Sequence, residues 1–171
     1  MCIRDSKDVV PAASDGGPTR WVTRERPKVD RIGCPWFLRR FVDPQALIFY
    51  IAADRVSEAA RELDAVPFDI DCVEFSHRGE LCSFDTFLDR FGIEDAALRH
   101  VARIVRGADT ARLDLEPEAA GLLAMALGLS AVYVDDHAAL AAGMALYDGL
   151  YGWARFARGE THNWPAQPAR T

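Results

Sequence analysis

The chain has short apolar runs in its first half and long helical periodicity in its second half. After a polar start, the pattern predicts a β-prone segment from Trp21, a helix over residues 29–42 and a buried strand over 46–52. A short helix over 56–63 follows. Apolar and polar residues then alternate over 66–75, and this period of two is typical of a strand.

The helix over residues 29–42 has two possible start points, because it contains Pro35. In the first, Asp30 is the N-cap and the proline lies early enough to cause only a local kink. In the second, the helix begins with the proline at its first position and Cys34 as the cap. The Asp-Pro dipeptide at 43–44 ends the helix, since a residue before proline avoids helical angles.

The second half of the chain is predicted to be almost entirely helical. The spacing of apolar residues and the glycine stops predict helices over 84–91 (capped by Ser83), over 94–106 (ended by Gly107), over 117–127 (ended by Gly128), and from Asp135 or Asp136 to about 158. Residues 130–134 form a short strand or an extended link. Because the strands come early and the helices late, we expect an α+β fold, a mostly helical single domain whose small β-sheet comes from the N-terminal half.

Composition and length set the domain organisation. With 171 residues, 50% hydrophobic and 27% charged, the chain fits one globular domain. Residues 1–20 are small, polar and turn-forming, so we expect a disordered tail or linker there, a domain over 21–165, and a second tail over 166–171.

Charge and cysteine content narrow the class of protein. The net charge of −6 argues against direct nucleic-acid binding, because phosphate contacts need a surplus of Lys and Arg. The longest uncharged stretch, residues 119–134, is shorter than the ~20 residues that span a membrane. The four cysteines form no CxxC pair, which favours reduced thiols in a cytoplasmic protein.

The densest candidate site is the DRIGCPW segment over residues 30–36. If the helix starts near Cys34, the free N–H groups of its first turn attract an anion and favour the nucleophilic thiolate. Arg31 would close over that anion, with Trp36 beside it, and Asp30 is a candidate metal ligand. The alternative is that Cys34 is a small buried hydrophobic residue and Asp30 only a cap.

A second candidate is the segment from Glu74 to Cys82. A carboxylate at 74 and an imidazole at His77 could share a metal ion, with the Cys82 thiolate as a third ligand. In a regular strand the first two would point to opposite faces, so a turn at Gly79 must bring them together. The alternative is that His77 binds the backbone and Glu74 is simply exposed.

Two further candidates lie in the helical half. Arg103 and Arg106 share a helix face and Asp109 follows, which suits an oxyanion or support for His77. The alternative is an Arg106–Asp109 ion pair that fixes the turn. Asp136, at a helix start, is either a metal ligand or an acid that complements the helix dipole.

Other histidines and cysteines receive simpler interpretations. We expect His100 at the surface or boundary of its helix and Cys72 in the core. Trp164 is expected to dock onto the core, and His162 is a weak candidate ligand.

Five segments form a recognisable set in order and spacing: WVTRERPKVDRIGCPWFLRRFVDP (21–44), VEFSHRGELCSFDTF (73–87), IVRGADT (104–110), GLLAMALGLS (121–130) and DDHAALAAGMALYDGLYGWAR (135–155). Together they resemble the C-terminal domain of the ChrB family of chromate-resistance proteins. The resemblance covers nearly everything from Trp21 to about residue 165 and implies a role in bacterial chromate resistance. It further implies that longer relatives carry an N-terminal regulatory half or a rhodanese-like domain.

Three functions are compatible with these features. The first is binding or sensing of chromate, a tetrahedral dianion, by Arg31, Arg106 and a helix N-terminus. The second is a small metalloenzyme with a divalent metal such as Zn or Fe. Its ligands would be Glu74, His77 and one of Asp30, Asp109 or Asp136. The third is a partner-binding domain without chemistry of its own.

Overall fold

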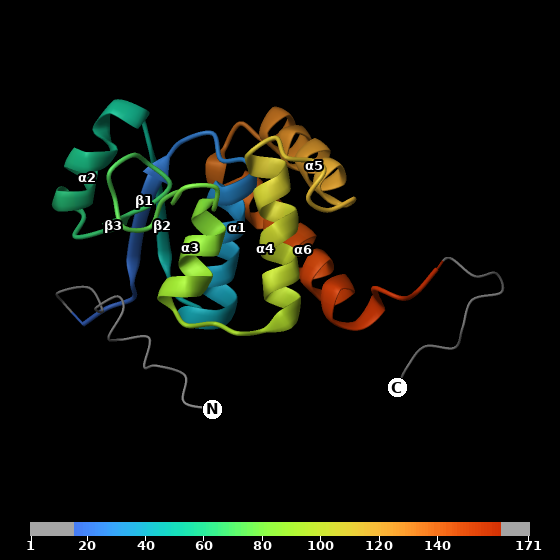
Figure 1. The fold of residues 1–171 in the computed structure, drawn as a ribbon. Coiled ribbons are helices and arrows are strands. Elements are labelled where there is room, and N and C mark those ends of the chain that lie inside the picture. The colour runs from blue at the N-terminus through green and yellow to red at the C-terminus, as the bar shows by residue number, and fades with distance from the viewer. Residues whose placement is uncertain (1–15, 162–171) are drawn as a thin grey trace.

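The computed structural model describes residues 16–161 and has the predicted α+β architecture (Figure 1). Its sheet has the strand order β2-β1-β3, and both pairings are parallel. The elements are β1 (Arg20–Arg24), α1 (Val29–Phe37), β2 (Leu47–Ile51), α2 (Val56–Glu62), β3 (Val66–Pro67), α3 (Ser83–Arg90), α4 (Ala96–Asp109), α5 (Ala119–Val132) and α6 (Asp136–Gly152). The expectations for His162 and Trp164 lie outside the described residues.

The sheet separates two hydrophobic clusters, because neighbouring residues of β1 face opposite sides. Val22 packs with Val56 and other residues of α2 on one side. Trp21 is fully buried on the other side, with its ring centroid 5.1 Å from that of Phe75 and 5.3 Å from that of Phe87. Figure 1 shows α2 on one side of the sheet and the remaining helices on the other.

Helix α1 begins at Val29, with Lys28 as its N-cap, so both predicted start points were wrong. Pro35 therefore lies inside the helix, where it cannot donate to the carbonyl four residues earlier, that of Arg31. The hydroxyl of Tyr50 on β2 donates to that carbonyl instead, at 2.8 Å. A tyrosine on strand β2 thus satisfies the Arg31 carbonyl that the proline leaves unpaired. The chain stays helical beyond the proline, through a π-helical turn at Leu38–Val42.

Two glycines that were predicted to end helices lie inside them. Helix α4 continues through Gly107 to Asp109, and a Cβ at this glycine would lie 2.8 Å from Ala119 Cβ. The glycine therefore permits close approach of α5 rather than ending α4. Helix α5 continues through Gly128 to Val132, so residues 130–132 are helical, and Tyr133, its C-cap, is extended.

The predicted strand over 66–75 is reduced to Val66–Pro67 in the structure. Asp69 and Cys72 have φ values of 52° and 61°, a left-handed conformation that interrupts pairing. Cys72 is exposed, so its predicted core position was wrong. The interrupted segment instead carries Asp69 and, beyond it, His77 along the edge of the sheet.

Candidate functional site

Four polar side chains meet at the carboxyl edge of the parallel sheet. Asp30 is in the first turn of α1, which follows β1, and Asp69 lies two residues after β3. His77 lies in the following turn, and Asp109 is the last residue of α4. The carboxyl ends of parallel strands share one edge of a sheet, which is where α/β proteins commonly place their ligands.

The imidazole of His77 lies at the centre of this group. Its Nε2 is 3.1 Å from Asp109 Oδ2, 3.5 Å from Asp69 Oδ1 and 3.6 Å from Asp30 Oδ2. The exposed fractions of the side chains are 1% for Asp30, 8% for Asp69, 22% for Asp109 and 41% for His77. The cluster therefore has a buried floor of two aspartates and opens to solvent on the side of the histidine.

The first residue of α3 holds the two buried aspartates in place. The backbone N–H of Ser83 donates to Asp30 Oδ2 at 2.7 Å, and its hydroxyl donates to Asp69 Oδ1 at 2.8 Å. One of the two predicted helix starts made Asp30 the cap of its own helix, but its carboxylate binds the start of α3. Arg24 and Arg31 approach Asp69 Oδ2 at 3.2 and 3.4 Å, so this carboxylate is also partly neutralised.

The turn that carries His77 is attached to α3 on both sides of the histidine. The hydroxyl of Thr86 donates to the Ser76 carbonyl at 2.8 Å, and Arg78 Nε donates to that hydroxyl at 3.1 Å. Gly79 has a φ of 61°, which allows the tight turn that was predicted there. The imidazole is therefore positioned by its neighbours as well as by the aspartates.

The cluster favours a bound cation. Burial, and then the nearby charges of Asp109 and Asp69, raise the pKa of Asp30 well above its usual value. Burial opposes ionisation of Asp69, but His77 and Ser83 lower the pKa of this carboxyl below its usual value. Interactions with Asp109 and Asp69 raise the pKa of His77 to about 10. In the absence of another cation, an imidazolium therefore balances the carboxylates at neutral pH.

The same side chains fit a divalent metal ion. Ligand atoms of Asp30, Asp69 and His77 all lie within 4.8 Å of one another. Asp30 Oδ1 is buried and has no hydrogen-bond partner among the described residues, although a buried carboxylate oxygen without one is costly. An imidazole with several carboxylates is a ligand set used for Zn and Fe.

A polar cleft of about 620 Å³ opens beside the cluster. Asp69 and His77 form one of its walls, and Arg24, Ser57 and Ser76 contribute further polar groups. The cleft is large enough for a small oxyanion and its water shell. It offers access from solvent to the exposed side of His77.

Three of the predicted site residues, Asp30, His77 and Asp109, thus converge, and Asp69 completes the group. Sequence reasoning missed Asp69 because it was assigned to a regular strand. The available signal was its position, an acid close to the end of a buried strand and therefore at the ligand-binding edge.

Other predicted residues make local contacts away from this cluster. Glu74 is exposed and its carboxylate lies 3.0 Å from Arg90, and the Asp136 carboxylate accepts from the backbone N–H of Arg26 at 3.1 Å. Arg103 binds Glu116. Arg106 donates to Asp85 at 3.1 Å, and the Arg106–Asp109 ion pair given as an alternative is absent from the described residues, where Asp109 contacts His77.

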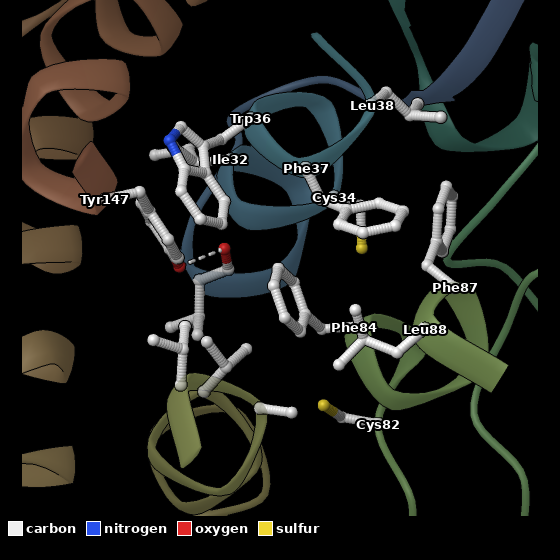
Figure 2. Packing of buried hydrophobic residues seen from close by; sticks show 14 of the residues in the cluster. Ile32, Cys34, Trp36, Phe37, Leu38, Cys82, Phe84, Phe87, Leu88 and Tyr147 are labelled. Carbon is white, nitrogen blue, oxygen red and sulfur yellow. Dashed lines mark hydrogen bonds between the residues drawn. The ribbon is translucent and has the colours of Figure 1, made fainter. Parts of the chain in front are cut away.

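The cysteines and the tryptophan of the candidate set lie in the hydrophobic core. Cys34 and Trp36 are fully buried in α1, and Trp36 Nε1 donates to Asp148 at 2.8 Å. Figure 2 shows the Cys34 and Cys82 side chains within the cluster of aromatic and aliphatic residues between α1, α3 and α4. Burial raises the pKa of both thiols. Because α1 starts at Val29, its N-terminus does not act on Cys34, and this cysteine is a small buried residue, the alternative given for it.

Comparison with known proteins assigns most of the described fold to one family. Residues 21–154 match the family described as "ChrB, C-terminal domain". The chain belongs to the ChrB family. All four residues of the Asp30/Asp69/His77/Asp109 cluster lie within the matched part of this ChrB domain.

A curated relative supports the assignment of the ChrB domain. The chain is 33% identical over 135 residues to "Protein ChrB" from Cupriavidus metallidurans (strain ATCC 43123 / DSM 2839 / NBRC 102507 / CH34). The match covers 77% of this chain but 40% of that protein, so the ChrB domain spans about two fifths of its relative's length. No solved structure matches the chain. Within residues 16–161, no helix is both long and apolar enough to cross a bilayer.

Proposed function

We propose that this chain is a chromate-resistance protein that binds a divalent metal ion between Asp30, Asp69, His77 and Asp109. The metal, together with Arg24 at the cleft, would bind chromate or a related oxyanion. Membership of the ChrB family supports the physiological role. The free thiols of the described cysteines support a reducing, cytoplasmic environment.

The observation that carries the metal proposal is the contact of one imidazole nitrogen with three carboxylates from separate segments. Gathering three acids around a half-buried histidine costs desolvation and repulsion, and a bound cation offsets both. The partnerless Oδ1 of Asp30 supplies a further free ligand atom on the buried side. A bound divalent metal would supply positive charge at this point and a coordination position for an oxyanion.

The charge of the cluster explains why the oxyanion is expected to need the metal. The aspartates repel a dianion, and Arg31 is already engaged by Asp69 and the Glu25 carbonyl. Arg106 is paired with Asp85, so neither arginine of the oxyanion site predicted from the sequence, Arg31 or Arg106, is free to bind the anion directly. Arg24 also contacts Asp69, at 3.2 Å, but it lines the cleft and its side chain is 43% exposed, against 18% for Arg31, so it can turn toward a bound anion.

The first experiment measures metal stoichiometry in protein purified without a histidine tag. After chelation and dialysis, wild-type protein should take up Zn²⁺ or Fe²⁺. His77→Gln and Asp109→Asn should each bind one equivalent less than wild type. The matched control is His137→Gln, which changes an exposed histidine outside the cluster and should retain the wild-type stoichiometry. Equal metal content in all four proteins would contradict the metal site.

The second experiment tests the oxyanion. Chromate and sulfate are titrated by calorimetry into metal-loaded and metal-free protein. Chromate should bind the loaded form, and Arg24→Ala should weaken it roughly tenfold because a charge-assisted hydrogen bond is lost. Chromate binding that is equally strong without metal would show that the metal plays no part in it.

The neighbouring cleft favours a metalloenzyme as the second candidate function, because it gives a substrate access to the exposed side of His77. In that case, loss of chromate from solution should require both the metal and His77. Chromate that binds and remains unchanged supports the binding function instead.

A further inference from the structure

We infer that the domain has a second divalent-cation site, formed by His100, Glu116 and Glu118 where α4 meets the start of α5. The site is separate from the Asp30/Asp69/His77/Asp109 cluster, and the inference does not rest on the proposed function. One ligand atom from each of the three side chains lies within 4.8 Å of the others. Arg103 contacts the Glu116 carboxylate, and the Trp153 ring lies against the His100 ring.

The imidazole of His100 is the first sign of a missing partner. We predicted this residue at the surface or boundary, but its side chain is only 9% exposed. Its Nε2 is buried without a hydrogen-bond partner among residues 16–161, and its Nδ1 lies 3.7 Å from Glu116 Oε1, beyond hydrogen-bond distance. A buried polar group without a partner is destabilising unless a ligand or water satisfies it.

Glu118 provides a second, independent sign. Its Oε2 is also buried and without a partner among the described residues. The residue is the N-cap of α5, yet its side chain makes no capping hydrogen bond. A glutamate at this position would normally turn to the helix N–H groups or to solvent, so its buried carboxylate oxygen is available to a cation.

The backbone presents the two glutamates on one side of a rigid turn. Pro117 separates them and fixes its own φ angle. The N–H of Ala119 donates to the Glu116 carbonyl at 3.1 Å, and the N–H of Leu122 donates to the Glu118 carbonyl at 3.0 Å. The backbone that carries both glutamates is therefore ordered before any ion arrives, which lowers the entropic cost of binding one.

Charge and ligand type favour Zn²⁺. Two glutamates face one histidine, and Arg103 Nε lies 2.5 Å from Glu116 Oε1 and balances only one of the two negative charges. The Arg103 side chain is 56% exposed, so it can move away when a metal binds. Imidazole nitrogens and carboxylate oxygens are both zinc ligands, and three protein ligands leave a fourth position open.

The test uses the full chain with His77→Gln, which removes the cluster at the sheet edge. Zn²⁺ is titrated by calorimetry after chelation, and one equivalent should still bind. Adding His100→Gln should abolish this binding, and adding the exposed-site change His137→Gln should leave it intact. Glu118→Gln is the second variant, because residue 118 is only partly buried whereas His100 is buried, so its substitution is less able to affect folding.

Arg103 gives a result that a purely structural role would not produce. Because the guanidinium competes with the metal for Glu116, Arg103→Gln should bind Zn²⁺ roughly two- to fivefold more tightly, the range expected for an exposed ion pair. Co²⁺ should quench the fluorescence of Trp153, whose ring centroid is 5.6 Å from that of His100, and Trp153→Phe should remove that signal.

These outcomes separate the two metal sites. Loss of the second equivalent in His100→Gln and Glu118→Gln, with tighter binding in Arg103→Gln, supports the second site even if the sheet-edge site fails. No Zn²⁺ uptake by the His77→Gln protein, or uptake that His100→Gln and Glu118→Gln leave unchanged, overturns it.

Discussion

At the scale of single residues, polar groups in this domain are satisfied by partners distant in the sequence. Tyr50 donates to the Arg31 carbonyl that Pro35 leaves free. Replacing Tyr50 with Phe should lower the free energy of unfolding by about 1–2 kcal/mol, because the part-buried carbonyl loses its donor. Urea denaturation measures the change. The control Tyr133→Phe, at a 36% exposed tyrosine, should stay within about 0.5 kcal/mol of wild type.

His77 makes the stability of the chelated protein depend on pH. Its pKa is raised from 6.5 to about 10 in the folded state, mainly by Asp109 and Asp69. A raised histidine pKa stabilises the fold fully below pH 6.5, and this contribution is lost as the pH rises through 10. The urea midpoint of wild-type protein should therefore fall between pH 7 and 10, and His77→Gln should flatten that decline. An identical slope in both proteins would show that His77 is not held by the aspartates.

At the scale of elements, helix periodicity is well predicted, but the meaning of each glycine depends on the neighbouring helix. Gly107 and Gly128 are both inside helices, although each was predicted to end one. A Cβ at Gly107 would lie 2.8 Å from Ala119 Cβ, and one at Gly128 would have no neighbour within 4 Å. The pattern along one chain does not contain this difference, because it arises only when α4 and α5 pack.

The two glycines give opposite predictions for the same substitution. Gly107→Ala should destabilise the domain by about 1–3 kcal/mol through overpacking, despite the better helix propensity of alanine. Gly128→Ala should stabilise it by up to ~1 kcal/mol, because only propensity changes. Thermal unfolding of both proteins measures the contrast. Stabilisation by both substitutions would show that α4 and α5 pack less closely than described.

The candidate site shows the same limit of prediction. Asp30, His77 and Asp109 are candidate metal ligands by sequence, and the structure brings them together. Asp69 was missed because the alternating sequence pattern assigned it to a strand. In the structure its left-handed backbone interrupts that strand and places it at the site. Cys34 was one of two candidate caps by sequence, but α1 begins earlier, at Val29, and the thiol lies in the core.

At the scale of the whole molecule, the cluster around His77 connects segments that are distant in the sequence: the starts of α1 and α3, the loop after β3 and the end of α4. A ligand that binds only this assembled site stabilises the entire fold, because the unfolded chain has no site to offer. The proposed metal should therefore raise the free energy of unfolding of the whole domain, and its effect should not be confined to one loop.

The size of that effect follows from mass action. In a His100→Gln background, free Zn²⁺ at 100 times its dissociation constant should add about 2.7 kcal/mol to the free energy of unfolding. Amide hydrogen exchange should slow in β1 and α4 alike, since both unfold with the site. Asp109→Asn should reduce the gain, because it removes the carboxylate nearest to His77. Protection confined to the turn around residue 77, with unchanged exchange in α4, would place the metal outside this four-segment site.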